Sequence, residues 1–154
     1  MYKGEADWTH IAKVKENPRI HIPIFGNGDI DSPEKAVLYK NRYGVDGLMI
    51  GRAAIGYPWI FREIKHYATT GQHLPPPTLN ERVDTAIEHL KTAIAWKGET
   101  LGILETRRHY GNYFKGFRGI KPYRMKLVTS METNEIYDTL EQMRIDFKSV
   151  EIHS

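Results

Sequence analysis

The sequence predicts an α/β fold followed by a small all-helical part, and three observations lead to this prediction. Two short apolar runs each end in glycine and a charged residue, IPIFGNGD over residues 22–29 and VDGLMIGR over residues 45–52. One helix-length segment separates them, which is the connection that two parallel strands require. Three consecutive prolines at positions 75–77 come later, and the chain beyond them has the apolar periodicity of helices.

Two parallel strands are expected over residues 21–25 and 45–50, because both segments are short, apolar and bounded by proline or glycine. A helix over residues 8–16 precedes them and ends before Pro18, which restricts the residue ahead of it. Two strands alone cannot bury both of their faces and both of their edges. We therefore expect this part of the chain either to associate with a second copy of itself or to have come from a longer polypeptide.

The helix between the two strands has clear signals at both ends. Ser32 offers a capping oxygen, Pro33 suits the first helical position, and Gly44 is a natural left-handed stop. Pro58 then opens another helix over residues 59–69.

The remaining helices are predicted beyond the proline linker. Thr78 and Glu81 have capping-box spacing at the start of the first of them. Gly98 and Gly102 are expected to separate this helix from those that follow. The later helices are expected over residues 104–115, near residues 122–128 and after Thr133.

Two domains follow from this pattern: residues 1–74, then a proline linker at 75–77, then a helical bundle over residues 78–154. Apolar residues at helical spacing are expected to form the core of the bundle. They are Val83, Ile87, Leu90 and Ile94, then Ile136, Leu140, Met143 and Phe147. A third set, Tyr110, Tyr113, Phe114 and Phe117, has i, i+3, i+4, i+7 spacing and is assigned to the core rather than to stacking on RNA bases.

The net charge of +3 is unevenly distributed, because residues 107–126 contain seven Lys or Arg and no Asp or Glu. Such segregation favours a polyanionic partner for this stretch, and a merely solvated basic helix face is the alternative. The candidate contact residues are Arg107, Arg108, Lys115, Arg118, Lys121, Arg124 and Lys126.

The two glycine-bearing strand ends form a candidate phosphate site. Gly28 and Gly51 lack the Cβ that would block close approach, and Arg52 can offer several donors to phosphate oxygens. A short helical turn after Arg52 is expected to direct its N–H groups at the same anion. Asn27 suits a polar ring edge or a hydroxyl, whereas Asp29 would repel phosphate and is expected to accept from backbone N–H groups or a hydroxyl. The last two units of a (β/α)₈ barrel hold a phosphate in this way, although glycine-rich turns also follow strands for steric reasons alone.

Several function classes are disfavoured by composition. The chain has no cysteine, so it offers no disulfide, thiolate metal site or cysteine nucleophile. Its seven histidines show no metal-site spacing, and no metal is expected. No apolar run approaches the roughly 20 residues of a membrane span, and the first residues lack the apolar core of a signal peptide, so a cytoplasmic location is expected.

Six segments, in this order, carry a resemblance to a known family. They are YKGEADW at 2–8, IPIFGNGDI at 22–30, GLMIGRAA at 47–54, PWIF at 58–61, RRHY at 107–110 and YFKG at 113–116. The chain resembles, over essentially all of its length, the C-terminal half of bacterial tRNA-dihydrouridine synthases.

The resemblance implies the end of an FMN-binding TIM barrel followed by a helical domain that binds tRNA. In the family, reduced FMN delivers hydride to C6 of uracil, a loop cysteine supplies the proton at C5, and NADPH reduces the flavin again. By matched position, Asn27, Gly28 and Asp29 would lie beside the ribityl and phosphate of FMN. Gly51 and Arg52 would bind the phosphate.

The chain also departs from the family, because the catalytic cysteine, a flavin-contacting lysine and a His-x-Arg-Thr segment belong upstream in its members. No catalytic residue is assigned here, and Met1 aligns with an internal position of the family. The isolated chain is expected neither to reduce uridine nor to hold FMN tightly. Two other interpretations are a non-catalytic RNA-binding helical module and a different FMN barrel oxidoreductase that acts on a small molecule.

Overall fold

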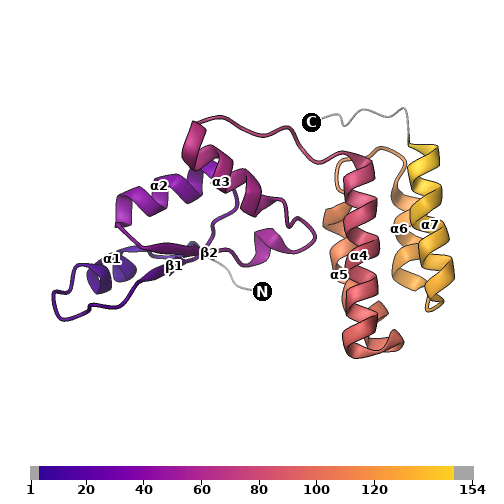
Figure 1. Ribbon diagram of the computed structural model, residues 1–154, viewed down its shortest axis with the longest axis horizontal. Helices are drawn as coiled ribbons and strands as arrows, with labels where there is room; N and C mark the ends of the chain where they lie inside the picture. Colours follow the sequence, from indigo (N-terminus) through magenta and orange to yellow (C-terminus); the bar gives the residue numbers. More distant parts are fainter. Residues whose placement is uncertain (1–3, 148–154) are drawn as a thin grey trace. The chain divides into compact units, whose positions relative to one another are not determined.

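The computed structural model describes residues 4–147, so Tyr2 and Lys3 of the first matched segment lie outside the described residues. The chain divides into two compact units between Pro75 and Pro76, which we call the α/β unit and the helical unit. In the α/β unit the elements are α1 Thr9–Lys15, β1 Phe25–Asn27, α2 Pro33–Tyr43, β2 Gly47–Met49, the 3₁₀ turn η1 Arg52–Ala54 and α3 Ile60–Thr70 (Figure 1). In the helical unit they are α4 Leu79–Lys97, α5 Glu99–Tyr113, α6 Lys121–Thr129 and α7 Thr133–Asp146.

The two strands pair in parallel, as predicted, with Phe25 opposite Gly47 and Asn27 opposite Met49. The predicted position of the first strand is wrong, since the ladder begins only at Phe25, and the second strand is likewise confined to Gly47–Met49.

A side chain explains where the first strand starts. The carboxylate of Asp46 accepts the backbone N–H of Ile24 at 2.7 Å, and the carbonyl of Ile24 accepts the backbone N–H of Asp46 at 2.9 Å. Pro23, just before it, has no N–H to give to a ladder. Ile22 is 71% exposed, so the residues before Ile24 do not form the buried strand that their composition predicts.

One face of the strand pair carries the core of the α/β unit. Trp8, Ile30, Ala36 and Val45 are buried together there. The indole of Trp8 lies so close to Gly26 that a Cβ on this glycine would come within 2.1 Å of a ring carbon.

The other face of the strand pair is open and carries two large apolar side chains. Successive residues of a strand point to opposite faces, so Phe25 and Met49 lie on the side away from Gly26. Phe25 is 65% exposed and Met49 is 60% exposed. The sheet therefore buries one of its faces and leaves the other uncovered by the described residues.

Helix ends in the α/β unit follow the predicted signals. The hydroxyl of Ser32 accepts the backbone N–H of Lys35, Pro33 is the first residue of α2, and Gly44 ends the helix in the left-handed conformation with φ 63°. Gly71 ends α3 in the same way, with φ 70°. The predictions for Ser32, Pro33 and Gly44 are confirmed.

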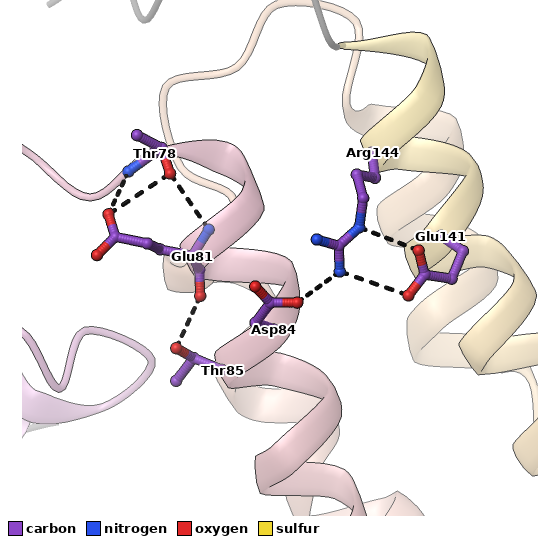
Figure 2. A network of polar contacts seen from close by, with 6 residues as sticks. All are labelled: Thr78, Glu81, Asp84, Thr85, Glu141 and Arg144. Atoms are coloured by element: carbon purple, nitrogen blue, oxygen red, sulfur yellow. Dashed lines mark hydrogen bonds and ion pairs between the residues drawn. The ribbon is translucent and has the colours of Figure 1, made fainter.

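In the helical unit, the predicted capping box at Thr78 and Glu81 is present (Figure 2). Arg144 of α7 donates to Asp84 of α4 at 2.6 Å and to Glu141 at 3.0 Å, which joins the first and last helices of the unit. The predicted core residues of α7 are all buried, and so is the aromatic set Tyr110, Tyr113, Phe114 and Phe117. Ile87 and Ile94 of α4 are only half-buried.

The sequence predicts that Gly102 separates two helices, and this prediction is wrong. Gly102 lies buried inside α5, which starts at Glu99. A Cβ at Gly102 would stand 2.7 Å from the backbone nitrogen of Ile94 in α4. Glycine therefore allows the backbones of α4 and α5 to approach closely, and the helix tolerates it because this packing compensates its low helix propensity.

Arg82 joins three segments of the helical unit from a buried position. Its Nε donates to the carbonyl of Pro77 at 3.1 Å and its Nη1 to the carbonyl of Tyr113 at 3.0 Å. Its guanidinium lies 5.4 Å from the centre of the Phe117 ring. Pro77, the last residue of the proline linker, is thus connected through Arg82 of α4 to the end of α5.

A pair of histidines lies between α4 and α5. Nδ1 of His89 is 3.0 Å from the hydroxyl of Tyr113, and the rings of His89 and His109 are 4.5 Å apart. Burial, together with the charge of neighbouring His89 and Arg108, lowers the pKa of His109 from 6.5 to about 4. Burial also lowers the pKa of His89. Both rings are therefore neutral in the folded protein at pH 7.

The close approach at Gly102 predicts opposite effects for two glycine substitutions in the same helix. Gly102→Ala should lower the free energy of unfolding by about 1–3 kcal/mol, because its methyl group overlaps the α4 backbone. Gly111→Ala is the matched control, since a Cβ there meets nothing within 4 Å. It should raise stability by roughly 0.5–1 kcal/mol through helix propensity. Urea unfolding followed by circular dichroism measures both, and equal effects would contradict the packing argument.

The half-buried histidines His89 and His109 predict that the helical unit loses stability in mild acid. A histidine whose folded pKa is lowered binds its proton more readily when unfolded. Its contribution is therefore complete above pH 6.5 and is lost as the pH falls from 6.5 toward about 4. His109→Gln should reduce the loss of unfolding free energy between neutral pH and about pH 5. An identical loss in the variant and in the parent chain would show that His109 does not titrate in this way.

Candidate functional site

A hollow of about 950 Å³ opens where the two strands end in the α/β unit. Because the carboxyl ends of parallel strands meet at one edge of a sheet, the loops after β1 and β2 converge there. The five predicted cofactor-binding residues, Asn27, Gly28, Asp29, Gly51 and Arg52, all line this hollow. The other lining residues are Gly4, Glu5, Ala6, Ile30, Asp31, Lys35, Met49 and Ala53.

The two predicted glycines of the site, Gly28 and Gly51, differ in what their missing side chain allows. Gly28 has φ +134°, and a Cβ there would stand 2.4 Å from the Cβ of Ala6. This glycine is required by the fold itself. A Cβ at Gly51 would meet nothing within 4 Å, so Gly51 borders open space and leaves its backbone accessible to a ligand.

Asp29 connects the loops at the mouth of the hollow. Its Oδ2 accepts the backbone N–H of Ala6 at 2.7 Å, and its Oδ1 accepts from Nη2 of Arg52 at 2.5 Å. The Asp29 side chain is 24% exposed, whereas that of Arg52 is 73% exposed. The carboxylate therefore binds a backbone N–H, as its chemistry suggests, and also holds the one arginine of the site.

Lys35 is a second cation at the hollow that the sequence reasoning missed. It lies in the first turn of α2, and its Nζ is 3.8 Å from Oδ1 of Asp31. Lys35 could have been predicted from its position in the first turn of α2. The helix that follows β1 starts at the edge of the sheet where the hollow lies. The charged residues that line the hollow are two cations, Lys35 and Arg52, and three carboxylates, those of Glu5, Asp29 and Asp31.

The basic residues of the helical unit fall into two groups. Arg107 is half-buried, and its Nη2 donates to the carbonyls of Thr129 at 3.1 Å and Ser130 at 2.8 Å, so it ties α5 to the end of α6. The six others, which we call the exposed cations, lie on α5, on α6 and on the segment that joins them. They are Arg108, Lys115, Arg118, Lys121, Arg124 and Lys126.

The described residues hold neither a cluster of metal-site type nor a helix of membrane-span type. Among residues 4–147, no group of three or more His, Asp or Glu side chains is arranged to hold a metal ion. Within the same range, none of the helices combines the length and the apolar character of a membrane span.

Comparison with known proteins identifies the relatives of the chain. The family model described as "Dihydrouridine synthase (Dus)" matches residues 1–149. The chain is 44% identical over 142 residues to "tRNA-dihydrouridine synthase B" of Pseudomonas putida, covering 92% of this chain and 40% of that protein. It is 49% identical over 113 residues to the protein of the same name from Shewanella oneidensis, covering 73% and 34%.

A "Probable tRNA-dihydrouridine synthase" of Rickettsia conorii is 37% identical over 124 residues, with 80% of this chain and 37% of that protein covered. The chain thus spans two fifths or less of the length of these three relatives. The family match extends over both the α/β unit and the helical unit. On these grounds the chain belongs to the dihydrouridine synthase family.

Proposed function

We propose that this chain is the C-terminal part of a flavin-dependent tRNA-dihydrouridine synthase, which reduces the 5,6 double bond of uridine in tRNA. The observation that carries the proposal is the convergence of Asn27, Gly28, Asp29, Gly51 and Arg52 on one hollow, in a chain of this family. The names of the relatives support tRNA as the substrate. NADPH is the proposed reductant.

The residues at the hollow suit the phosphorylated tail of FMN. Gly51 leaves open space beside its backbone, and the exposed guanidinium of Arg52 provides donors in a fork that matches phosphate oxygens. Asn27 and Gly28 stand beside them and would contact the hydroxyl-bearing chain next to the phosphate. When bound, FMN supplies the hydride for the reduction. The residues of this chain bind and orient its tail.

The open face of the strand pair supports the assignment to a larger barrel. Phe25 and Met49 would face the barrel interior and be covered by strands from the preceding part of the protein. Alternatively, a second copy of this chain would cover the open face of the strand pair. Because the chain has no cysteine, we assign the proton donor to the preceding part as well.

The helical unit is the proposed tRNA-binding surface. Its exposed cations would neutralise backbone phosphates, which is a binding mode without a requirement for a particular sequence. The buried aromatic rings of α5 hold the core and are not available for base stacking. A small-molecule flavin oxidoreductase would have no use for these cations, whereas a non-catalytic RNA-binding module would use them equally.

A chimeric protein tests the enzymatic proposal. The chain is joined behind the preceding part of the Pseudomonas putida relative, and FMN binding and dihydrouridine formation in tRNA are measured. Arg52→Ala should weaken FMN binding by roughly tenfold to a hundredfold and leave riboflavin binding almost unchanged, because riboflavin lacks the phosphate. Arg19→Ala, an exposed cation outside the hollow, is the control. The isolated chain should form no dihydrouridine. A chimera that folds and binds tRNA without reducing it would favour the binding module.

Salt dependence tests the exposed cations. The affinity of the chain for tRNA should fall steeply as salt rises, because each neutralised phosphate releases counterions. Replacing Arg118, Lys121 and Arg124 by alanine should weaken binding and flatten the slope of log K against log salt by about 0.7–0.9 for each phosphate that is no longer neutralised. Lys91→Ala, an exposed cation of α4 outside the basic stretch, should change little. Fluorescence anisotropy measures the slope, and an affinity independent of salt would exclude phosphate binding by these side chains.

A further inference from the structure

Net charge does not explain how the hollow would attract an anion. Three carboxylates and two cations line it, and each cation has a carboxylate partner. The Arg52–Asp29 pair is neutral as a whole, and so is the Lys35–Asp31 pair. Anion binding at this place must therefore depend on the direction of individual donors, among them those of Arg52, and not on net charge.

Asp29 is restrained more strongly than the arginine it binds. Its backbone is in the left-handed region with φ 53°, and its carboxylate also accepts the N–H of Ala6. Arg52, by contrast, is a long and largely exposed side chain, which loses considerable rotamer freedom when it is held in one place. The ion pair engages Nη2 of Arg52, and the guanidinium has two further nitrogens that carry donors.

We propose that Asp29 is a positioning residue for Arg52. It holds the guanidinium at the mouth of the hollow, with the remaining donors available to a phosphate. The carboxylate thus supports anion binding although its own charge opposes it, because it removes the entropy cost of ordering Arg52. This inference rests on the proposed function, since it concerns the same phosphate site.

A comparison of two carboxylates separates positioning from charge. Asp29→Asn and Asp31→Asn remove the same charge from the same hollow, but only Asp29 holds Arg52. Asparagine tolerates the left-handed backbone and can still accept the N–H of Ala6. Asp29→Gly is a second variant, because glycine takes a positive φ without strain. The indole N–H of Trp8, which donates to the carbonyl of Gly28, reports whether the loop keeps its fold.

The measurement is a titration of the ¹⁵N-labelled full chain with inorganic phosphate, followed by NMR at the amides of Gly51 and Arg52 and at Nε–H of Arg52. Asp31→Asn should bind phosphate as well as the parent chain or slightly better, because a repelling charge is removed. Asp29→Asn and Asp29→Gly should bind about three- to fivefold more weakly than Asp31→Asn, the range expected for an exposed ion pair. In an Arg52→Ala background, Asp29→Asn should cause no loss relative to Asp31→Asn.

Each contrary outcome has its own meaning. If both Asp29 variants bind phosphate as tightly as Asp31→Asn, the positioning role is wrong and the phosphate site stands. If Asp29→Asn causes the same loss without Arg52, Asp29 acts on the loop and not through the arginine, which also overturns the inference. If phosphate shifts neither Gly51 nor Arg52 in the parent chain, both this inference and the proposed phosphate site are wrong.

Discussion

The packing of the Trp8 indole against the backbone of β1 is the constraint on which the α/β unit depends. The ring occupies the space that a side chain at Gly26 would fill, and its N–H donates to the carbonyl of Gly28 at 2.9 Å. The same ring packs against Tyr39 and Tyr43 of α2. One side chain therefore joins the start of α1, the crossover helix and the loop that carries the candidate site. Gly26 of β1 is therefore explained by this packing before any ligand is considered.

A strand pair packed in this way can satisfy only one of its faces. The face toward Trp8 is buried, and the face with Phe25 and Met49 is open. In a (β/α)₈ barrel this second face is the interior, which neighbouring strands fill with side chains. In the proposed barrel, the strands that would cover the open face belong to the part of the relatives that this chain does not span. The described part of the helical unit differs, because helices α4 to α7 enclose a core of their own.

Local signals were readable in the sequence, and long-range packing was not. Gly44 ends α2 because the backbone there is left-handed, a requirement that is visible from the pattern of neighbouring residues. The start of β1 depends on the carboxylate of Asp46, which lies more than twenty positions away. Gly102 reads as a helix breaker until the α4 backbone beside it is known. The convergence of Asn27, Gly28, Asp29, Gly51 and Arg52 on one hollow was predictable, because parallel strand ends meet at one edge of a sheet. The positions of Lys35 and of the Arg52 ion pair require the actual distances.

The two units face different physical problems if both bind phosphate. A single phosphate in a fixed position needs donors in a defined geometry, so oriented donors such as those of Arg52 suit it even in a hollow without excess positive charge. A tRNA backbone presents many phosphates in no single position, and an excess of exposed cations on flexible side chains suits it better. Arg107 belongs to neither group of anion-binding residues, because its guanidinium donates to backbone carbonyls of Thr129 and Ser130. It thereby stabilises the contact between α5 and the end of α6, which carry several of the exposed cations. Under the proposed function, the uneven charge of the chain matches this difference between one oriented arginine and many exposed cations.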